Sequence, residues 1–305
     1  MQGKTAQRTT AQPRVVLVTR PTEYEALLAR HGTRAQAEFF LRTRGQDLGQ
    51  AHERHERFQA ALQGVSSTIP VQWRRTHVRR DDLARFLFEP DDFVLALGQD
   101  GLVANVAKYL DGQPVVGLNP DPAAYEGVLV PHPPEATADL LATLRAGREV
   151  VEERTMVEAK LDDGQRLLAL NELYLGHQSH QSSRYQIELG GRSENHSSSG
   201  VIVSTGTGAT GWTRSIHRNR VTPIELPEPS ERRLCVFVRE AWHSVATGVE
   251  LTDGEVREGE ELIVTSRMNE GGSVFGDGIE ADRLRFDWGR RATIRLAQER
   301  LRLVR

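Results

Sequence analysis

The sequence predicts an α/β N-terminal domain with an open, largely parallel sheet, followed by a β-rich C-terminal domain. The 305 residues are about the length of two ordinary domains. In the first half, apolar runs alternate with helical spacing, whereas strand-like runs crowd together from about residue 150. We expect a flexible tail at 1–13, the α/β domain at 14–148 and the β-rich domain at 149–305. The last residues are candidates for a return to the first domain.

The first half alternates strand and helix patterns. VVLVT, residues 15–19, is a β-branched run typical of a strand covered on both faces. Residues 33–62 place apolar residues among charges, which indicates one or two amphipathic helices ending near Gly64. Segment 131–149 has a Pro-rich start and a helical middle, as expected for the crossing between the halves. We expect further strands at 69–75, 93–97 and 114–119, and further helical segments at 81–88 and 102–110.

The second half is mostly strand. Its apolar and β-branched runs are separated by Gly, Asn, Asp and Pro clusters. We expect strands at 154–161, 166–175, 185–190, 200–205, 233–238, 248–253, 260–266 and 292–298.

Composition narrows the classes of function. A net charge of -3 and a pI near 6.4 provide no overall basic field, so a nucleic-acid partner is not expected. The single cysteine, Cys235, has no partner for an intramolecular disulfide and fits a reducing cytoplasm. No segment has the length and hydropathy of a membrane span or a signal peptide. We therefore expect a cytoplasmic protein that does not bind membranes.

A GQDG turn, residues 98–101, follows one of the buried strands. A strand that leads through glycines into a helix points backbone N–H groups and the helix N-terminus at one spot, which favours a bound phosphate. Asp100 in such a turn can take a proton from an attacking hydroxyl or hold a cation. The alternative is that Asp100 only caps the helix.

Two polar segments lie among the later strands. Asn171 and Glu172 follow an apolar run, and an adjacent amide and carboxylate can bind a ribose diol or an adenine edge. The alternative is a turn or bulge with polar side chains in solvent. His177 and His180 lack further metal-ligand spacing, so we expect a polar loop there and no metal site.

The stretch VIVSTGTGATGW, residues 201–212, runs from a strand into alternating Gly and Thr. The glycines would admit a ligand close to the backbone, the threonine hydroxyls would bind it, and Trp212 would offer a flat face. Packing of Trp212 in the core is the alternative. Replacing Gly208 by Val is expected to abolish ligand binding without disturbing the fold. Asp277 lies between two glycines, a pattern that predicts a β-hairpin turn.

Taken in order, the GQDG turn, the LNE segment at 170–172 and SSSGVIVSTGTGATGW resemble the NAD kinase family, in a divergent branch. That family carries a GGDG turn, an asparagine with an acidic neighbour, and a TPTGSTAY loop. The resemblance covers most of residues 90–290. It implies the NAD kinase/diacylglycerol kinase-like fold and phosphorylation of NAD at the adenosine-ribose 2′-hydroxyl to give NADP.

The resemblance also implies roles for individual residues. Asp100 would be the general base, and ATP, the phosphate donor, would bind at the turn with Mg²⁺. Mg²⁺ keeps mostly water and phosphate ligands, so no protein ligand to it is named. A homo-oligomer is expected. The residues implied to bind ATP phosphates are Gly98, Gln99 and Gly101, and those implied to bind NAD are Asn171, Glu172, Thr205, Thr207, Gly208, Thr210 and Trp212.

The departures from the family pattern leave two alternatives open. Gln99 replaces a glycine, which would be costly if that position required a positive φ. Ser199 replaces an aspartate, and Trp212 replaces a tyrosine, so the acceptor pocket has a different outline. A kinase of the same superfamily acting on a lipid or another small molecule is one alternative. A catalytically silent nucleotide-binding regulator is the other.

Overall fold

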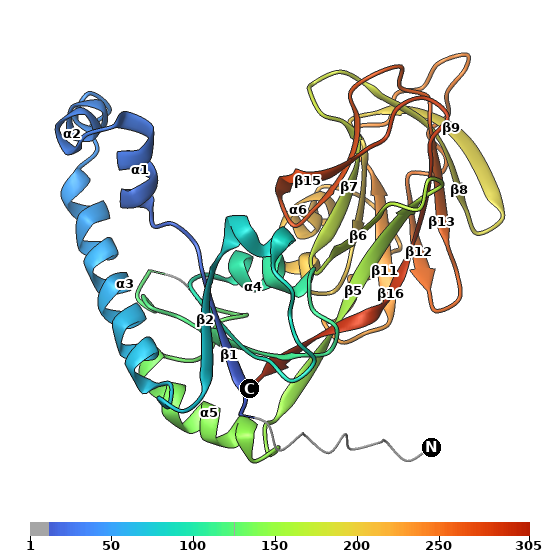
Figure 1. The fold of residues 1–305 in the computed structure, drawn as a ribbon. Coiled ribbons are helices and arrows are strands. Elements are labelled where there is room, and N and C mark those ends of the chain that lie inside the picture. The colour runs from blue at the N-terminus through green and yellow to red at the C-terminus, as the bar shows by residue number, and fades with distance from the viewer. Residues whose placement is uncertain (1–11, 125) are drawn as a thin grey trace. The chain divides into compact units, whose positions relative to one another are not determined.

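The computed structural model describes residues 12–124 and 126–305, so most of the expected tail, residues 1–11, lies outside the described residues. The chain divides into two compact units, each of which is described by itself. Unit 1 contains the described residues up to Tyr109, together with Gln113–Val151 and Arg302–Arg305. Unit 2 contains Leu110–Gly112 and Glu152–Leu301. Figure 1 shows the elements of both.

Unit 1 is built on a parallel sheet in the order β2-β1-β3-β4, with the end of β16 added beside β4. Val15 and Leu17 pack in a core on one face, while Val16 and Val18 point to the opposite face and are also fully buried. Both faces are therefore covered, as a β-branched run without polar residues requires. The strands are β1 (Arg14–Thr19), β2 (Arg74–Arg79), β3 (Phe93–Leu97), β4 (Pro114–Leu118) and β16 (Arg291–Val304).

Helices α3 and α5 contribute Val65, Leu141 and Leu144 to the core on one face of this sheet. Helices α1 and α2 contact α3 near its N-terminal end (Figure 1). Thr22 starts α1 with a capping box, in which its hydroxyl accepts from Glu25 N and the Glu25 carboxylate accepts from Thr22 N. The helical segments are α1 (Glu23–His31), α2 (Arg34–Arg42), α3 (Leu48–Thr68), α4 (Asp100–Ala107), α5 (Thr137–Arg145), and the 3₁₀ turns η1 (Arg80–Arg85) and η2 (Pro134–Ala136).

Unit 2 is made of antiparallel strands around one core. A six-stranded sheet has the order β12-β11-β10-β7-β14-β15. In the other sheet, β16 is followed by β13, β8 and β9, while β5 pairs with β16 and β6 pairs with β5. The strands are β5 (Val151–Leu161), β6 (Arg166–Ala169), β7 (Glu172–His177), β8 (Ser183–Leu189), β9 (Arg192–Ser198), β10 (Val201–Ser204), β11 (Arg233–Val238), β12 (Asp253–Arg257), β13 (Leu262–Ser266), β14 (Gly272–Gly276) and β15 (Ile279–Arg285). The helical segments are η3 (Gly208–Thr210) and α6 (Trp212–Arg218).

The predicted fold class, an open and largely parallel α/β sheet followed by a β-rich part, is confirmed. Several of the predicted helix and strand boundaries were wrong. Residues 69–73 precede β2 instead of starting it, and 81–88 form a 3₁₀ turn and coil instead of a helix. Helix α3 continues through Gly64 to Thr68, and 248–252 are coil. Strand β9 was missed because its sequence, RSENHSS, is almost entirely polar.

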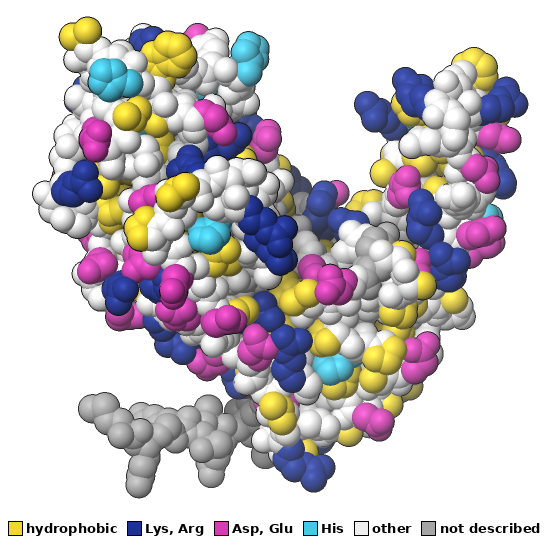
Figure 2. Space-filling view, turned by 180° about the vertical axis from the view of Figure 1, so that it is seen from behind, with side chains coloured by type: hydrophobic (Ala, Val, Ile, Leu, Met, Phe, Trp, Pro, Cys, Tyr) yellow, Lys and Arg dark blue, Asp and Glu magenta, His cyan; other side chains and the backbone are white. Residues whose placement is uncertain are grey.

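Figure 2 shows Lys and Arg side chains interspersed with Asp and Glu over the face that it presents. This mixture agrees with the small net charge of -3. No helix within residues 12–124 and 126–305 is long and apolar enough to cross a lipid bilayer.

Candidate functional site

The GQDG turn lies at the C-terminal end of β3. Gln99 is the N-cap residue of α4, and Asp100 is the first helical residue. The φ of Gln99 is -110°, in the extended region, so a side chain at this position carries no backbone strain. The expected cost of replacing the family's glycine by Gln99 is therefore absent.

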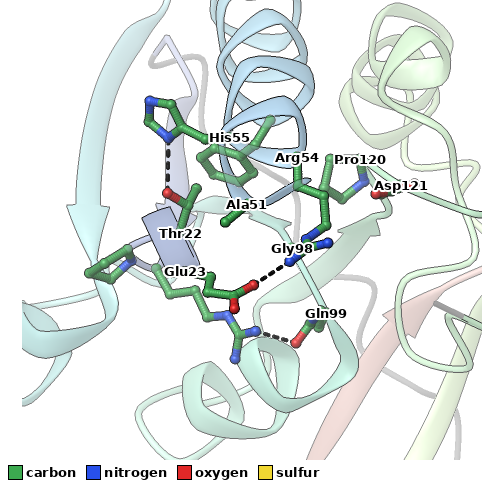
Figure 3. A pocket seen from close by; sticks show the side chains of 12 residues that line it. Thr22, Glu23, Ala51, Arg54, His55, Gly98, Gln99, Pro120 and Asp121 are labelled. Carbon is green, nitrogen blue, oxygen red and sulfur yellow. Dashed lines mark hydrogen bonds and ion pairs between the residues drawn. The ribbon is translucent and has the colours of Figure 1, made fainter. Parts of the chain in front are cut away.

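A pocket of about 320 Å³ opens at the turn, at the C-terminal ends of three parallel strands (Figure 3). Its lining comes from segment 20–23 after β1, from Gly98 and Gln99 after β3, from Pro120 and Asp121 after β4, and from one side of α3. The chain leaves β1 toward β2 on one side and returns to β3 on the other. A ligand crevice forms at this kind of switch point in open α/β sheets.

The lining of the pocket includes two arginines, Arg20 and Arg54, and two acidic residues, Glu23 and Asp121. Arg20 donates a hydrogen bond from Nη2 to Gln99 Oε1, and Arg54 pairs with Glu23 at 2.5 Å. Dashed lines in Figure 3 mark the contact at Gln99 and the contact between Arg54 and Glu23. Guanidinium groups beside backbone N–H groups at a helix N-terminus suit a phosphate-bearing ligand.

The carboxylate of Asp100 is held in place by backbone. Oδ1 accepts from Leu129 N at 2.8 Å, and Oδ2 accepts from Val128 N at 3.1 Å. An ionised carboxylate has about four acceptor positions, so each oxygen keeps one lone pair for another partner. The capping alternative is not what the geometry shows, because these bonds join Asp100 to a different segment of unit 1.

Unit 2 gathers Asn171 and Glu172 with the turn between β14 and β15. Asp277, with a φ of 55°, forms that turn as its sequence indicated. Its carboxylate also accepts from Asn171 N at 2.7 Å and from Leu170 N at 2.9 Å. The sequence interpretation had not assigned this second role, because the two segments are about a hundred residues apart in the chain.

Glu172 starts β7 and is largely buried. Burial, reinforced by the nearby negative charge of Asp277, raises the pKa of the Glu172 carboxyl to about 7. A carboxyl group that titrates near neutral pH beside a second carboxylate is typical of functional sites.

The Gly/Thr stretch turns back onto Asn171. Thr205 N donates to Asn171 O at 2.9 Å, and the Thr205 hydroxyl donates to Leu170 O at 2.5 Å. A Cβ on Gly208 would lie 2.3 Å from Asn171 O, and one on Gly206 would lie 2.0 Å from Glu228 O. Backbone of unit 2, instead of a ligand, fills the space beside these two glycines. The expectation that Gly208→Val would leave the fold intact is therefore wrong.

Thr207 contacts a charged residue that the sequence analysis missed. Arg154 on β5 has a side chain only 3% exposed, pairs with Glu152 at 3.0 Å, and donates from Nη1 to Thr207 Oγ1 at 3.3 Å. Arginine is seldom buried without a partner, but a single Arg in a strand carries no sequence signal of burial.

Trp212 begins α6 and is partly exposed. Its ring stacks on Tyr174 with centroids 6.2 Å apart, and the Arg239 guanidinium lies 4.9 Å from its centroid. Thr210 is exposed, and its hydroxyl donates to Thr207 O at 3.0 Å. Trp212 thus packs on one face within the protein, as the core-packing alternative anticipated in part.

The predicted site residues fall into two groups. Gly98, Gln99, Asp100 and Gly101 lie together in unit 1, and Asn171, Glu172, Thr205, Thr207 and Gly208 lie together in unit 2. Among the described residues, no group of three His, Cys, Asp or Glu side chains is arranged to hold a metal ion. His177 is buried, and its Nδ1 accepts from Ser179 N at 3.1 Å.

No protein-family model matches this sequence, and no curated protein matches it. Solved structures do match. Yeast NADH kinase in complex with NADH has a TM-score of 0.60 and 12% identity, over 97% of this chain and 84% of that chain. An NAD kinase from Archaeoglobus fulgidus in complex with ATP has a TM-score of 0.58 and 18% identity, over 96% of this chain and 93% of that chain. The expected similarity to NAD kinases is confirmed for the fold.

Proposed function

We propose that this protein transfers the γ-phosphoryl group of ATP to the 2′-hydroxyl of the adenosine ribose of NAD, giving NADP and ADP. The observation that carries the proposal is the GQDG turn, which stands at the end of β3 and at the start of α4 in a chain with the NAD kinase fold. The similar archaeal kinase was solved with ATP and the similar yeast kinase with NADH, which supports these two ligand classes here.

The donor phosphates would bind in the pocket at the turn. Gly98 and Gln99 line this pocket, Gly101 is exposed in the first turn of α4, and the N-terminus of α4 favours negative charge. Arg20 would exchange its bond to Gln99 for a phosphate oxygen. ATP would arrive with its own Mg²⁺, and the described residues offer no cage for that ion, so we assign it no protein ligand.

Asp100 would act as the general base. The 2′-oxygen forms a bond to the γ-phosphorus as the bond from phosphorus to the bridging oxygen breaks, and ADP leaves. The proton of the 2′-hydroxyl passes to a free lone pair of the Asp100 carboxylate. The backbone bonds from Val128 and Leu129 would hold the carboxylate in one orientation during this transfer.

Residues of unit 2 would bind the acceptor. The Asn171 side-chain amide and the Glu172 carboxyl would contact ribose hydroxyls or the adenine edge, with their backbone fixed by Asp277 and Thr205. Thr207, Thr210 and Trp212 would complete this part of the site, and Gly208 would support it by its close approach to Asn171.

A second candidate is a kinase of the same fold with another acceptor. Trp212, stacked on Tyr174 with Arg239 over its ring, presents a cationic and aromatic face where the family has a tyrosine. An acceptor bound against this face would differ from NAD in the part of the molecule outside the adenosine ribose.

The test compares wild type with Asp100→Asn in an assay of NADP formation from NAD, ATP and Mg²⁺. Asp139→Asn, which changes an exposed carboxylate on α5, is the matched control. We expect turnover that falls at least a hundredfold in Asp100→Asn, with ATP affinity kept within a few fold and turnover of the control unchanged. Folded wild-type protein that binds ATP and phosphorylates neither NAD nor NADH would overturn the proposal, and turnover of a different acceptor would establish the second candidate.

A further inference from the structure

A second pocket lies in unit 2, beside β8 and β9, and none of its residues belongs to the candidate site. Its volume is about 710 Å³, within the ordinary range for small-molecule sites. Two tryptophans, two arginines and a histidine dominate its lining.

The pocket wall is held together by specific bonds. The segment after β11 lies along β9, where Trp242 N donates to Ser197 O at 2.7 Å and Gly248 N donates to Asn195 O at 3.0 Å. The Glu194 carboxylate accepts from Leu251 N at 2.8 Å. These bonds make the pocket a feature of the packed structure and not a gap beside a loose loop.

The charged side chains of the lining are all cationic. Arg184 and Arg267 belong to it, and it contains no Asp or Glu. Within residues 12–124 and 126–305, Arg184 has no ion-pair or side-chain hydrogen-bond partner, and the side chain of Arg267 has a single polar partner, Gln186 Oε1 at 3.4 Å. Two guanidinium groups without carboxylates favour an anion, above all a phosphate.

The pocket also exposes two aromatic faces. Trp242 is 71% exposed and Trp288 is 64% exposed, although large aromatic side chains usually bury most of their surface. A planar ring that stacks on an indole removes this surface from water and gains the attraction between aromatic faces.

The ring nitrogens of His196 do not reach the surface of the pocket. The residue is 1% exposed, its ring stacks on Tyr185 with centroids 5.7 Å apart, and both of its ring nitrogens are buried. Tyr185 and Arg184 are successive residues of β8, so the Arg184 side chain points to the opposite face of the sheet.

We propose that this pocket binds a small anion that carries a planar ring, the chemistry of a nucleoside monophosphate. Arg184 and Arg267 bind the phosphate, and an indole of Trp242 or Trp288 stacks on the base. The site goes beyond the proposed function, because phosphoryl transfer needs none of these residues.

The test is isothermal titration of the full-length protein with AMP, adenosine and inorganic phosphate. We expect saturable binding of AMP, with adenosine and phosphate each bound at least tenfold more weakly. The double variant Arg184→Ala/Arg267→Ala and the variant Trp242→Ala should each weaken AMP binding at least tenfold. Arg192→Ala, an exposed arginine on β9 outside the pocket, is the matched control and should change nothing.

Arg20→Ala weakens nucleotide binding in the pocket of unit 1, so AMP binding that persists in this variant and is lost in the pocket variants belongs to the pocket of unit 2. AMP binding that is absent, or that survives the pocket variants, would overturn the proposal. If inorganic phosphate bound with the same affinity as AMP, the pocket would bind only the anion, and the proposed stacking of a ring on Trp242 or Trp288 would be wrong. Light scattering measures the molar mass of Trp242→Ala and Trp288→Ala. A changed molar mass without loss of AMP binding would show that the pocket is an interface with a second copy of the chain.

Discussion

The carboxylate of Asp277 accepts a hydrogen bond from the backbone N–H of Asn171 at 2.7 Å, and so joins the β14–β15 turn to the segment before β7. Leu170 N donates to the other oxygen at 2.9 Å. One turn residue therefore fixes the backbone that presents both Asn171 and Glu172.

Replacing Asp277 by Asn should destabilise the protein. Asn tolerates the positive φ of this position, so the change tests the carboxylate and not the turn conformation. One of the two N–H donors would face an amide NH₂ group, at a cost of about 2 kcal/mol. Urea unfolding measures this loss, and Asp163→Asn, in the exposed turn between β5 and β6, should lower the midpoint much less. Equal midpoints for the two variants would show that the Asp277 bonds contribute little.

Glu172 should make stability depend on pH. Its folded-state pKa of about 7 lies above the value of 4.5 expected when the chain unfolds, so the folded state binds more protons between these pH values. Stability should therefore fall as pH rises through this window, by about 3 kcal/mol in total, with the full loss reached above pH 7. Glu172→Gln should remove this part of the slope between about pH 5 and about pH 8 in urea unfolding. An identical slope in the variant would contradict the assignment.

Arg20→Ala should weaken ATP binding about tenfold, because a charge-assisted contact to phosphate is lost from the pocket at the GQDG turn. Arg75→Ala removes an exposed arginine of β2 outside the pocket and is the control. Titration calorimetry with ATP and Mg²⁺ measures both. Unchanged ATP affinity in Arg20→Ala would show that the donor phosphates do not bind in this pocket.

Cys235 should be unreactive in the native protein. Burial raises the pKa of its thiol to about 12, and the side chain is fully enclosed in β11. Ellman's reagent at about pH 8 should label it only as fast as the protein unfolds, and immediately in guanidinium. Rapid labelling of folded protein would show that β11 opens locally.

The sequence by itself determined the two-part architecture. Runs such as VVLVT at 15–19 and FVLAL at 93–97 are buried on both faces of a parallel sheet, and apolar periodicity reports this burial directly. The position of Asp100 after a strand and at the start of a helix also followed from the turn residues. Polar β9 could not be found in this way, because its strand hydrogen bonds come from β8 and not from its own side-chain pattern.

Only the tertiary structure decided what surrounds the site residues. Gly208 looked like a place for a ligand, yet Asn171 O occupies the space where its Cβ would be. Asp277 was predicted only as a turn residue, yet its carboxylate accepts a hydrogen bond from Asn171 N, and its charge adds to the rise in the Glu172 pKa that burial causes. Contacts between segments about a hundred residues apart depend on sheet pairing, which places β7 between β10 and β14. Local sequence patterns report the burial of a residue, whereas its partners are set by which strands become neighbours.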